Sequence, residues 1–297
     1  MSVYHQIFQL SDRPMVILMQ NKRETKIEDA NVAFVRLTGY RLPEMQARAN
    51  EHITQRYFVD PSQTLLKSEV VIYTKKKKPV SIRVNQQPLP AEERDDARRS
   101  LIIIEDLSAY KWIEKQCAKN KVLISGTLDC NQHIRFLRDS LAPLLFEPDN
   151  RLEDETLMAF IADADHERLK KALHSASRTK KEGSLKLQTS KLSGIELELS
   201  ITFAPILDGF DEVKEFAFVI LDLKPVDDKI SASMKLKIWM AKRDMSAAQL
   251  SIATGISIQT ISKLRNGKIK KPQRLTAELI ASELQVEIGE IWDAIRK

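Results

Sequence analysis

Residues 246–272 constrain the fold of this chain most strongly, because they predict two short helices joined by a tight turn. Ser246 and Gln249 have the spacing of a capping box, in which each residue bonds the backbone of the other at a helix start. Leu250 is then the inward residue of a short first helix. Gly255 suits a turn at positive φ, which glycine adopts without steric cost. Such a helix pair can place its second helix in the major groove of DNA.

The second helix of this pair is predicted to begin at the N-cap Ser257 and to end at Asn266-Gly267, with Ile261 and Leu264 buried. Its outer face is the candidate for contact with bases. Glutamine can bond adenine, lysine can reach guanine, and an apolar tip can cover a thymine methyl group. The predicted base-reading residues are Ser257, Ile258, Gln259, Thr260 and Lys263. An alternative for Ile258 is a contact with the first helix of its own domain.

The positive charge of the chain is concentrated around these helices. The sequence holds 47 Lys+Arg and 41 Asp+Glu; residues 231–297 contain 12 and 6 of them, which leaves 35 of each in residues 1–230. Such an asymmetry is typical of a phosphate-binding face, although a solvated helical surface is the alternative. The predicted phosphate contacts are Asn266, Lys268, Lys270 and Lys271, which would fix register without reading sequence.

The spacing of Leu250, Gly255, Ile256, Ile261 and Leu264 resembles the Cro/repressor-type (Xre) helix-turn-helix family, and so does the tail 266–272. The resemblance implies an all-α domain of five helices at 235–297 that binds double-stranded operator DNA as a homodimer. Its expected core includes Leu275, Leu279, Leu284, Ile288, Ile291 and Trp292. The sequence departs from the family pattern at Ser251, Thr254 and Arg265, and the arginine adds positive charge that favours DNA contact.

Composition excludes several other classes of protein. The two cysteines, Cys117 and Cys130, make no disulfide framework; buried, inert thiols are expected, with a redox-sensitive crosslink as the alternative. We find no metal-ligand spacing, no phosphate-binding glycine loop and no nucleophile motif, so no enzyme and no metal site are expected. No apolar run is long enough for a membrane span and no secretory signal begins the chain, so a cytoplasmic location is expected.

The first block, residues 1–108, predicts a sheet with helices on one face. Strands are expected at 15–20, 25–30, 70–74, 80–86 and 100–107, and helices at 31–40 and 42–49. The four lysines at 75–78 suggest nucleic acid, but between two alternating strands a hairpin tip is the simpler interpretation.

The second block, residues 118–226, repeats this order. Strands are expected at 122–129, 133–137, 184–190, 195–207 and 215–223. Helical segments are expected at 140–146 and 152–161, and a long amphipathic helix at 162–179 with Leu169, Leu173 and His174 near one face.

A second resemblance rests on Asp29-Ala30-Asn31, Phe34, Leu37-Thr38-Gly39-Tyr40 and Glu44, which are similar to the pattern of PAS domains. Residues 105–108 stand where PAS domains pass into a signalling helix, and the second block resembles a more divergent PAS domain. PAS domains often hold haem, flavin or small metabolites, so a ligand is possible and its identity unknown. His166 and His174 are weak haem candidates, with capping or packing as the plain alternatives, and no flavin-thiol cysteine is present.

These patterns together predict an α+β fold. Two tandem PAS-like domains occupy 1–108 and 118–226, with a helical connector at 109–117, and a linker at 227–234 leads to the helix-turn-helix domain at 235–297. In the connector, Leu107, Tyr110, Ile113 and Cys117 share one stripe, which would pair with a second copy or dock on its own sheet. The expected function is sequence-specific transcriptional regulation, with a small-molecule or protein signal at the PAS-like domains. The alternative is an adaptor that binds other regulators instead of DNA.

Overall fold

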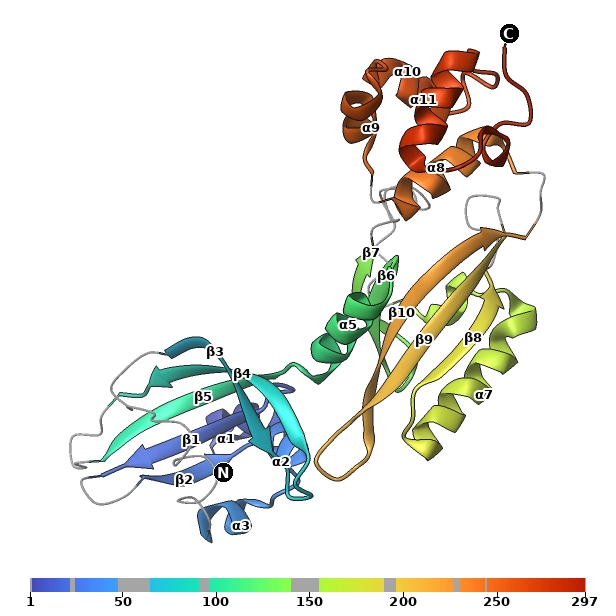
Figure 1. The fold of residues 1–297 in the computed structure, drawn as a ribbon. Helices are drawn as coiled ribbons and strands as arrows, with labels where there is room; N and C mark the ends of the chain where they lie inside the picture. The colour runs from blue at the N-terminus through green and yellow to red at the C-terminus, as the bar shows by residue number, and fades with distance from the viewer. Residues whose placement is uncertain are drawn as a thin grey trace. The chain divides into compact units, whose positions relative to one another are not determined.

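The computed structural model describes residues 2–21, 25–47, 65–90, 97–139, 155–189, 196–226, 230–243 and 245–296. The chain forms two compact units. The first is Met1–Lys115 together with Pro205–Phe216, and the second is Gln116–Ala204 together with Ala217–Lys297. The fold is α+β, with one five-stranded antiparallel sheet near the N-terminus, a second in the middle of the chain, and a C-terminal helical domain (Figure 1).

The first sheet has the strand order β2-β1-β5-β4-β3. Its strands are β1 (Met15–Gln20), β2 (Thr25–Ala30), β3 (Leu65–Tyr73), β4 (Pro79–Pro88) and β5 (Arg98–Asp106). Strand β1 lies between β2 and β5 and pairs antiparallel with both, with Val16 opposite Ala30 on β2 and opposite Ile102 on β5. Buried and exposed residues alternate along β4 and β5, as in a sheet covered on one face. The predicted strands of this block are therefore confirmed, and so is the hairpin tip at 75–78.

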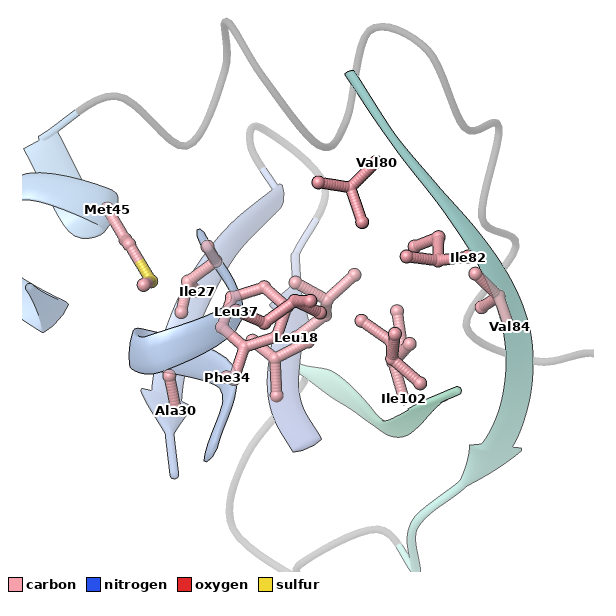
Figure 2. Packing of buried hydrophobic residues seen from close by; sticks show 12 residues of the cluster. Leu18, Ile27, Ala30, Phe34, Leu37, Met45, Val80, Ile82, Val84 and Ile102 are labelled. Carbon is pink, nitrogen blue, oxygen red and sulfur yellow. The ribbon is translucent and has the colours of Figure 1, made fainter. Parts of the chain in front are cut away.

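Helices α2 (Val32–Thr38) and α3 (Leu42–Ala47) follow β2. Phe34 and Leu37 on α2 and Met45 on α3 are buried with Leu18 and Ile102 of the sheet in one apolar core (Figure 2). A preceding helix, α1 (Val3–Leu10), was not expected from the sequence.

Asn31 holds the start of α2 in place. Its side-chain oxygen accepts hydrogen bonds from the N–H of Phe34 and of Met15, both at 2.9 Å, and its amide nitrogen donates to the carbonyl of Arg13 at 2.7 Å. The residue is fully buried, so these bonds compensate the loss of water around a polar side chain. The Asp-Ala-Asn motif thus ends β2 and caps α2 at once.

The second sheet has the equivalent order, β7-β6-β10-β9-β8. Its strands are β6 (Ile124–Asp129), β7 (Ile134–Asp139), β8 (Gly183–Gln188), β9 (Leu197–Leu207) and β10 (Val213–Pro225). Helix α7 (Asp163–Thr179) lies along β8 (Figure 1) and buries Leu169 and Leu173. The helical segment predicted at 140–146 lies outside the described residues. Of the one predicted at 152–161, the described part is only a short 3-10 helix, η1 (Leu157–Phe160).

Helix α5 (Ser108–Lys119) connects the two sheet regions in sequence. Leu107, Ala109 and Ile113 are buried, whereas Tyr110 and Cys117 are exposed. Of the predicted stripe, Leu107 and Ile113 are thus buried within the protein, whereas Tyr110 and Cys117 lie at its surface.

The C-terminal domain contains α8 (Ala232–Lys242), α9 (Ala247–Thr254), α10 (Ile258–Arg265) and α11 (Arg274–Leu284), followed by the 3-10 helix η2 (Ile288–Glu290). The fifth α-helix predicted from 288–295 is thus only a short 3-10 turn among the described residues. Leu284, Ile291 and Trp292 are buried as expected. The predicted burial of Leu275 and Leu279 was wrong, since their exposed fractions are 66% and 39% and Ala277, Ile280 and Ala281 face the core instead.

Candidate DNA interface

The helix pair α9–α10 is built by local hydrogen bonds that the sequence makes available. The Ser246 hydroxyl accepts from the N–H of Gln249 at 3.2 Å, and the Gln249 side-chain oxygen accepts from the N–H of Ser246 at 2.8 Å. This is a complete capping box at the start of α9. Gly255 ends α9 at a φ of 70°, a conformation that costs a residue with a Cβ free energy.

Two hydroxyl side chains close the turn after α9. Thr254 donates to the carbonyl of Leu250, and Ser251 donates to the carbonyl of Ile256, both at 2.6 Å. These two positions depart from the family pattern, and in this chain their hydroxyls form hydrogen bonds to partly buried backbone carbonyls. The turn geometry between the helices is thereby kept.

Helix α10 presents a polar outer face. Its N-cap, Ser257, accepts from the N–H of Thr260 at 3.2 Å, and Ile261 and Leu264 bury its inner face in the domain core. The predicted base-reading residues Ser257, Ile258, Gln259 and Lys263 are all exposed, and Thr260 is half-buried. Ile258 is 51% exposed, so half of its surface remains open to an apolar contact.

The hydroxyl groups on this face are already engaged. Ser257 and Thr260 bond each other at 2.9 Å between their side-chain oxygens. Among the predicted base-reading residues, Gln259 and Lys263 therefore have the side chains most available to base edges. Base reading by these side chains stays a prediction.

The basic residues of this domain divide into two groups. Lys235 binds Asp293 at 3.0 Å, Arg274 binds Glu278 at 2.7 Å, and the Arg243 guanidinium donates to the carbonyl of Leu284 at 2.8 Å. These cations are used within the protein.

A second group of cations has no such use. Within the described part of the chain, no ion pair engages Lys263, Lys268, Lys270 or Lys271, and all four are exposed. They lie on α10 and on the segment directly after it. Four exposed lysines without an ion pair thus lie on α10 and directly after it.

A surface hollow of about 710 Å³ brings several of these residues together. It is lined by, among others, Thr260, Lys268, Lys270, Lys271, Thr276 and Arg296. Thr276 and Arg296 were not predicted from the sequence, and of these two Arg296 is distant in the chain from the lysines. A backbone bond from the N–H of Arg296 to the carbonyl of Pro272, at 2.8 Å, returns the C-terminus to this site.

Arg265, whose charge was expected to favour DNA contact, is less accessible than the lysines of this face. The residue is half-buried, and its Nε is buried with no hydrogen-bond partner among the described residues. Its guanidinium therefore does not belong with the exposed lysines of this face.

Outside this domain, the ligand candidates of the sequence lie as follows. His166 Nε2 is 2.9 Å from the carbonyl oxygens of Met158 and Ile161. This nitrogen therefore lies within hydrogen-bond distance of the backbone in and directly after η1. His174 is exposed on α7 and is not packed as the alternative reading supposed. Cys117 and Cys130 are exposed, so the expectation of buried thiols was wrong. Across the described ranges, no cluster of three or more His, Cys, Asp and Glu residues could hold a metal ion.

The model of the Cro/C1-type HTH DNA-binding domain family matches residues 235–297. A 60-residue stretch is 36% identical to an uncharacterised HTH-type transcriptional regulator, YozG, of Bacillus subtilis (strain 168); it covers 20% of this chain and 71% of that protein. The domain is thus a helix-turn-helix DNA-binding domain. The chain belongs to the family of HTH-type transcriptional regulators.

The N-terminal part is similar to solved structures of LOV proteins, which are PAS-like. The Rhodobacter sphaeroides LOV protein is 18% identical, with a TM-score of 0.28, over 35% of this chain and 65% of that one. A fungal LOV-domain photoreceptor is 20% identical, with a TM-score of 0.27, over 32% of this chain and 75% of that one. Likenesses this weak say nothing about a ligand. In the described segments, no helix combines the length and apolarity needed to cross a bilayer.

Proposed function

We propose that this protein is a sequence-specific transcriptional regulator that reads its operator with the exposed face of α10. Gln259 and Lys263, together with Ile258, would contact base edges, and Ser257 and Thr260 would lie at the groove entrance. Lys268, Lys270, Lys271 and the Asn266 side chain would bind phosphates on the flank. The observation that carries this proposal is the set of exposed lysines without an ion pair beside α10.

The proposed division of the chain is a PAS-like domain at 1–108, a connector at 109–117, a second PAS-like domain at 118–226, a linker at 227–234 and the DNA-binding domain at 235–297. The PAS-like domains would dimerise the protein and respond to a small-molecule or protein signal. A homodimer is favoured because helix-turn-helix domains bind half-sites, and a two-fold operator matches a two-fold protein.

The experiment that tests this function is a salt titration of full-length protein on DNA selected for binding. Phosphate contacts release counterions, so the observed affinity should fall steeply with salt, by about 0.9 in log–log slope for each phosphate neutralised. Three lysines in contact with phosphates would give a slope of roughly −2.7 per domain.

The adaptor alternative predicts a different result. Ile252 on α9 is 84% exposed, and an apolar side chain on the outside of this domain would suit a protein partner. An adaptor would bind DNA weakly and without enrichment of any sequence. Replacement of Ile252 by Ser would then remove partner binding, whereas DNA binding by a regulator should change little.

A further inference from the structure

The lysine turn, which we define as Lys75–Lys78 between β3 and β4, faces an acidic turn within the first unit. The acidic turn is Asp208–Glu212, between β9 and β10, and it belongs to the same compact unit as residues 1–115. Lys76 Nζ lies 2.7 Å from one carboxylate oxygen of Asp211 and donates to the carbonyl of Phe210 at 3.1 Å. Lys78 Nζ binds the other carboxylate oxygen of Asp211.

Backbone contacts accompany these ion pairs. The N–H of Gly209 donates to the carbonyl of Arg36, in the last turn of α2, at 2.7 Å. Helix-end carbonyls lack partners inside the helix, so this bond satisfies one of them. A Cβ at Gly209 would lie 2.1 Å from the nitrogen of Gly39, and one at Gly39 would lie 2.4 Å from the carbonyl oxygen of Gly209. Both positions therefore need glycine for this approach.

The acidic turn is also held by hydrogen bonds within itself. The Asp208 carboxylate accepts from the N–H groups of Phe210 and Glu212, both at 2.9 Å. Asp211 follows at a φ of 71°, a conformation that the surrounding bonds must hold. Its hydrogen bonds to Lys76 and then Lys78 lower the pKa of the Asp211 carboxyl to about 2.

The lysine turn forms ion pairs with acidic side chains from two other segments of the chain. Lys75 binds Glu44 at 2.6 Å, and the hydrogen bond from Lys75 holds the pKa of the Glu44 carboxyl below its ordinary value. Asp211 takes up Lys76 and Lys78. Three of the four lysines of this turn are thus paired with two carboxylates, so the turn already has an acidic partner from the chain itself.

We propose that the acidic turn Asp208–Glu212 is a releasable latch that closes on the lysine turn and on the end of α2 in the first PAS-like domain. The ion pairs are partly exposed, so salt weakens them. The close backbone contact between Gly209 and Gly39 carries no charge and determines how closely the two turns approach in the closed state. Strand β10 runs from this latch as far as Pro225, just before the linker to α8. Any effect of release on DNA binding rests on the proposed function, but the latch itself does not.

Amide hydrogen exchange in the full-length protein, followed by mass spectrometry without DNA, tests the latch. Asp211→Lys should speed exchange about three- to tenfold in peptides from 205–216 and 36–40, since it removes two exposed pairs and adds repulsion. About 0.5 M salt should act in the same direction on the unmodified protein. The charge swap of Asp211→Lys with Lys76→Glu and Lys78→Glu should restore slow exchange.

Two further variants complete the test. Glu212→Gln is the matched control, because Glu212 is exposed and its side chain has no partner among the described residues, so exchange should stay unchanged. Gly209→Ala should open the latch at every salt concentration, since its Cβ would overlap the Gly39 backbone. Exchange in β5 (98–106) and in the part of β9 at 197–204 reports whether the two sheets remain folded in each variant. Unchanged exchange at 205–216 and 36–40 in both Asp211→Lys and Gly209→Ala would overturn the proposal, whatever the DNA affinity.

Discussion

Removal of three unpaired lysines should lower the salt dependence of DNA binding in a predictable way. Lys268, Lys270 and Lys271 line one hollow beside α10 and carry no ion pair in the described parts of the chain. If each neutralises one phosphate, the triple replacement by alanine should reduce the log–log slope by about 2.7 units for each DNA-binding domain that is bound. Between 50 and 200 mM salt, the unmodified protein should then lose about 40-fold more affinity than the variant does for each bound domain.

The assay is fluorescence anisotropy of a labelled operator with full-length protein at several salt concentrations. The matched control is the triple variant Lys170→Ala, Lys171→Ala and Lys181→Ala, which removes the same charge from exposed sites in the second PAS-like domain. Its slope should equal that of the unmodified protein. Equal slopes for all three proteins, or a lower slope in the control as well, would refute the assignment of these lysines to phosphate contacts.

Three other results are expected. Gln259→Ala should cost about 1–3 kcal/mol on the preferred site and relax the preference at one base pair, as binding to single-base variants of the operator can show. Leu250→Ala should lower the free energy of unfolding by about 2–5 kcal/mol in urea, because Leu250 is fully buried, whereas the exposed Leu275→Ala should change it by less than about 0.5 kcal/mol. The lowered pKa of Asp211 means that its ion pairs stabilise the fold fully at pH values above 3.8, the ordinary pKa of the group, and that this stabilisation is lost as pH falls through about 2. A carbon-13 NMR titration of the Asp211 carboxyl should find its midpoint near this lower value. The double variant Lys76→Ala with Lys78→Ala should raise the midpoint.

The sequence predicts most of the first sheet correctly because each strand carries its own alternation. In β1, Val16 and Leu18 are buried while their neighbours are only partly covered, and this period of two is visible in the letters. Helix α1 was not predicted, although Val3, Ile7 and Leu10 have the spacing of one helix face. In the structure Val3, Tyr4, Ile7 and Leu10 are all largely exposed.

The turn chemistry of the DNA-binding domain was equally visible. A capping box, a glycine at positive φ and a serine N-cap are local features, and α9 and α10 follow them closely. The buried face of α11 was misassigned because small residues form most of it. Ala277 and Ala281 are buried beside Ile280, while the larger Leu275 and Leu279 point outward, and the preference for large apolar residues in cores misleads in such a helix.

The contacts between distant parts of the chain could not be read from the sequence. Gly209 and Gly39 are far apart in the chain, and nothing in either local pattern indicates that the two backbones touch. Arg296 likewise reaches the hollow beside α10 only through the return of the C-terminus to Pro272. Both contacts depend on tertiary packing, which local periodicity does not encode.

The central claim is that the exposed face of α10 reads DNA sequence. Selection of bound oligonucleotides from a random pool, carried out in parallel with the full-length protein and its Gln259→Ala variant, tests it most directly. The account predicts one enriched motif for the unmodified protein and the same motif with a single base pair relaxed for the variant. Failure to enrich any motif, or an identical motif with both proteins, would contradict the reading role of Gln259; the first result would contradict sequence-specific binding altogether.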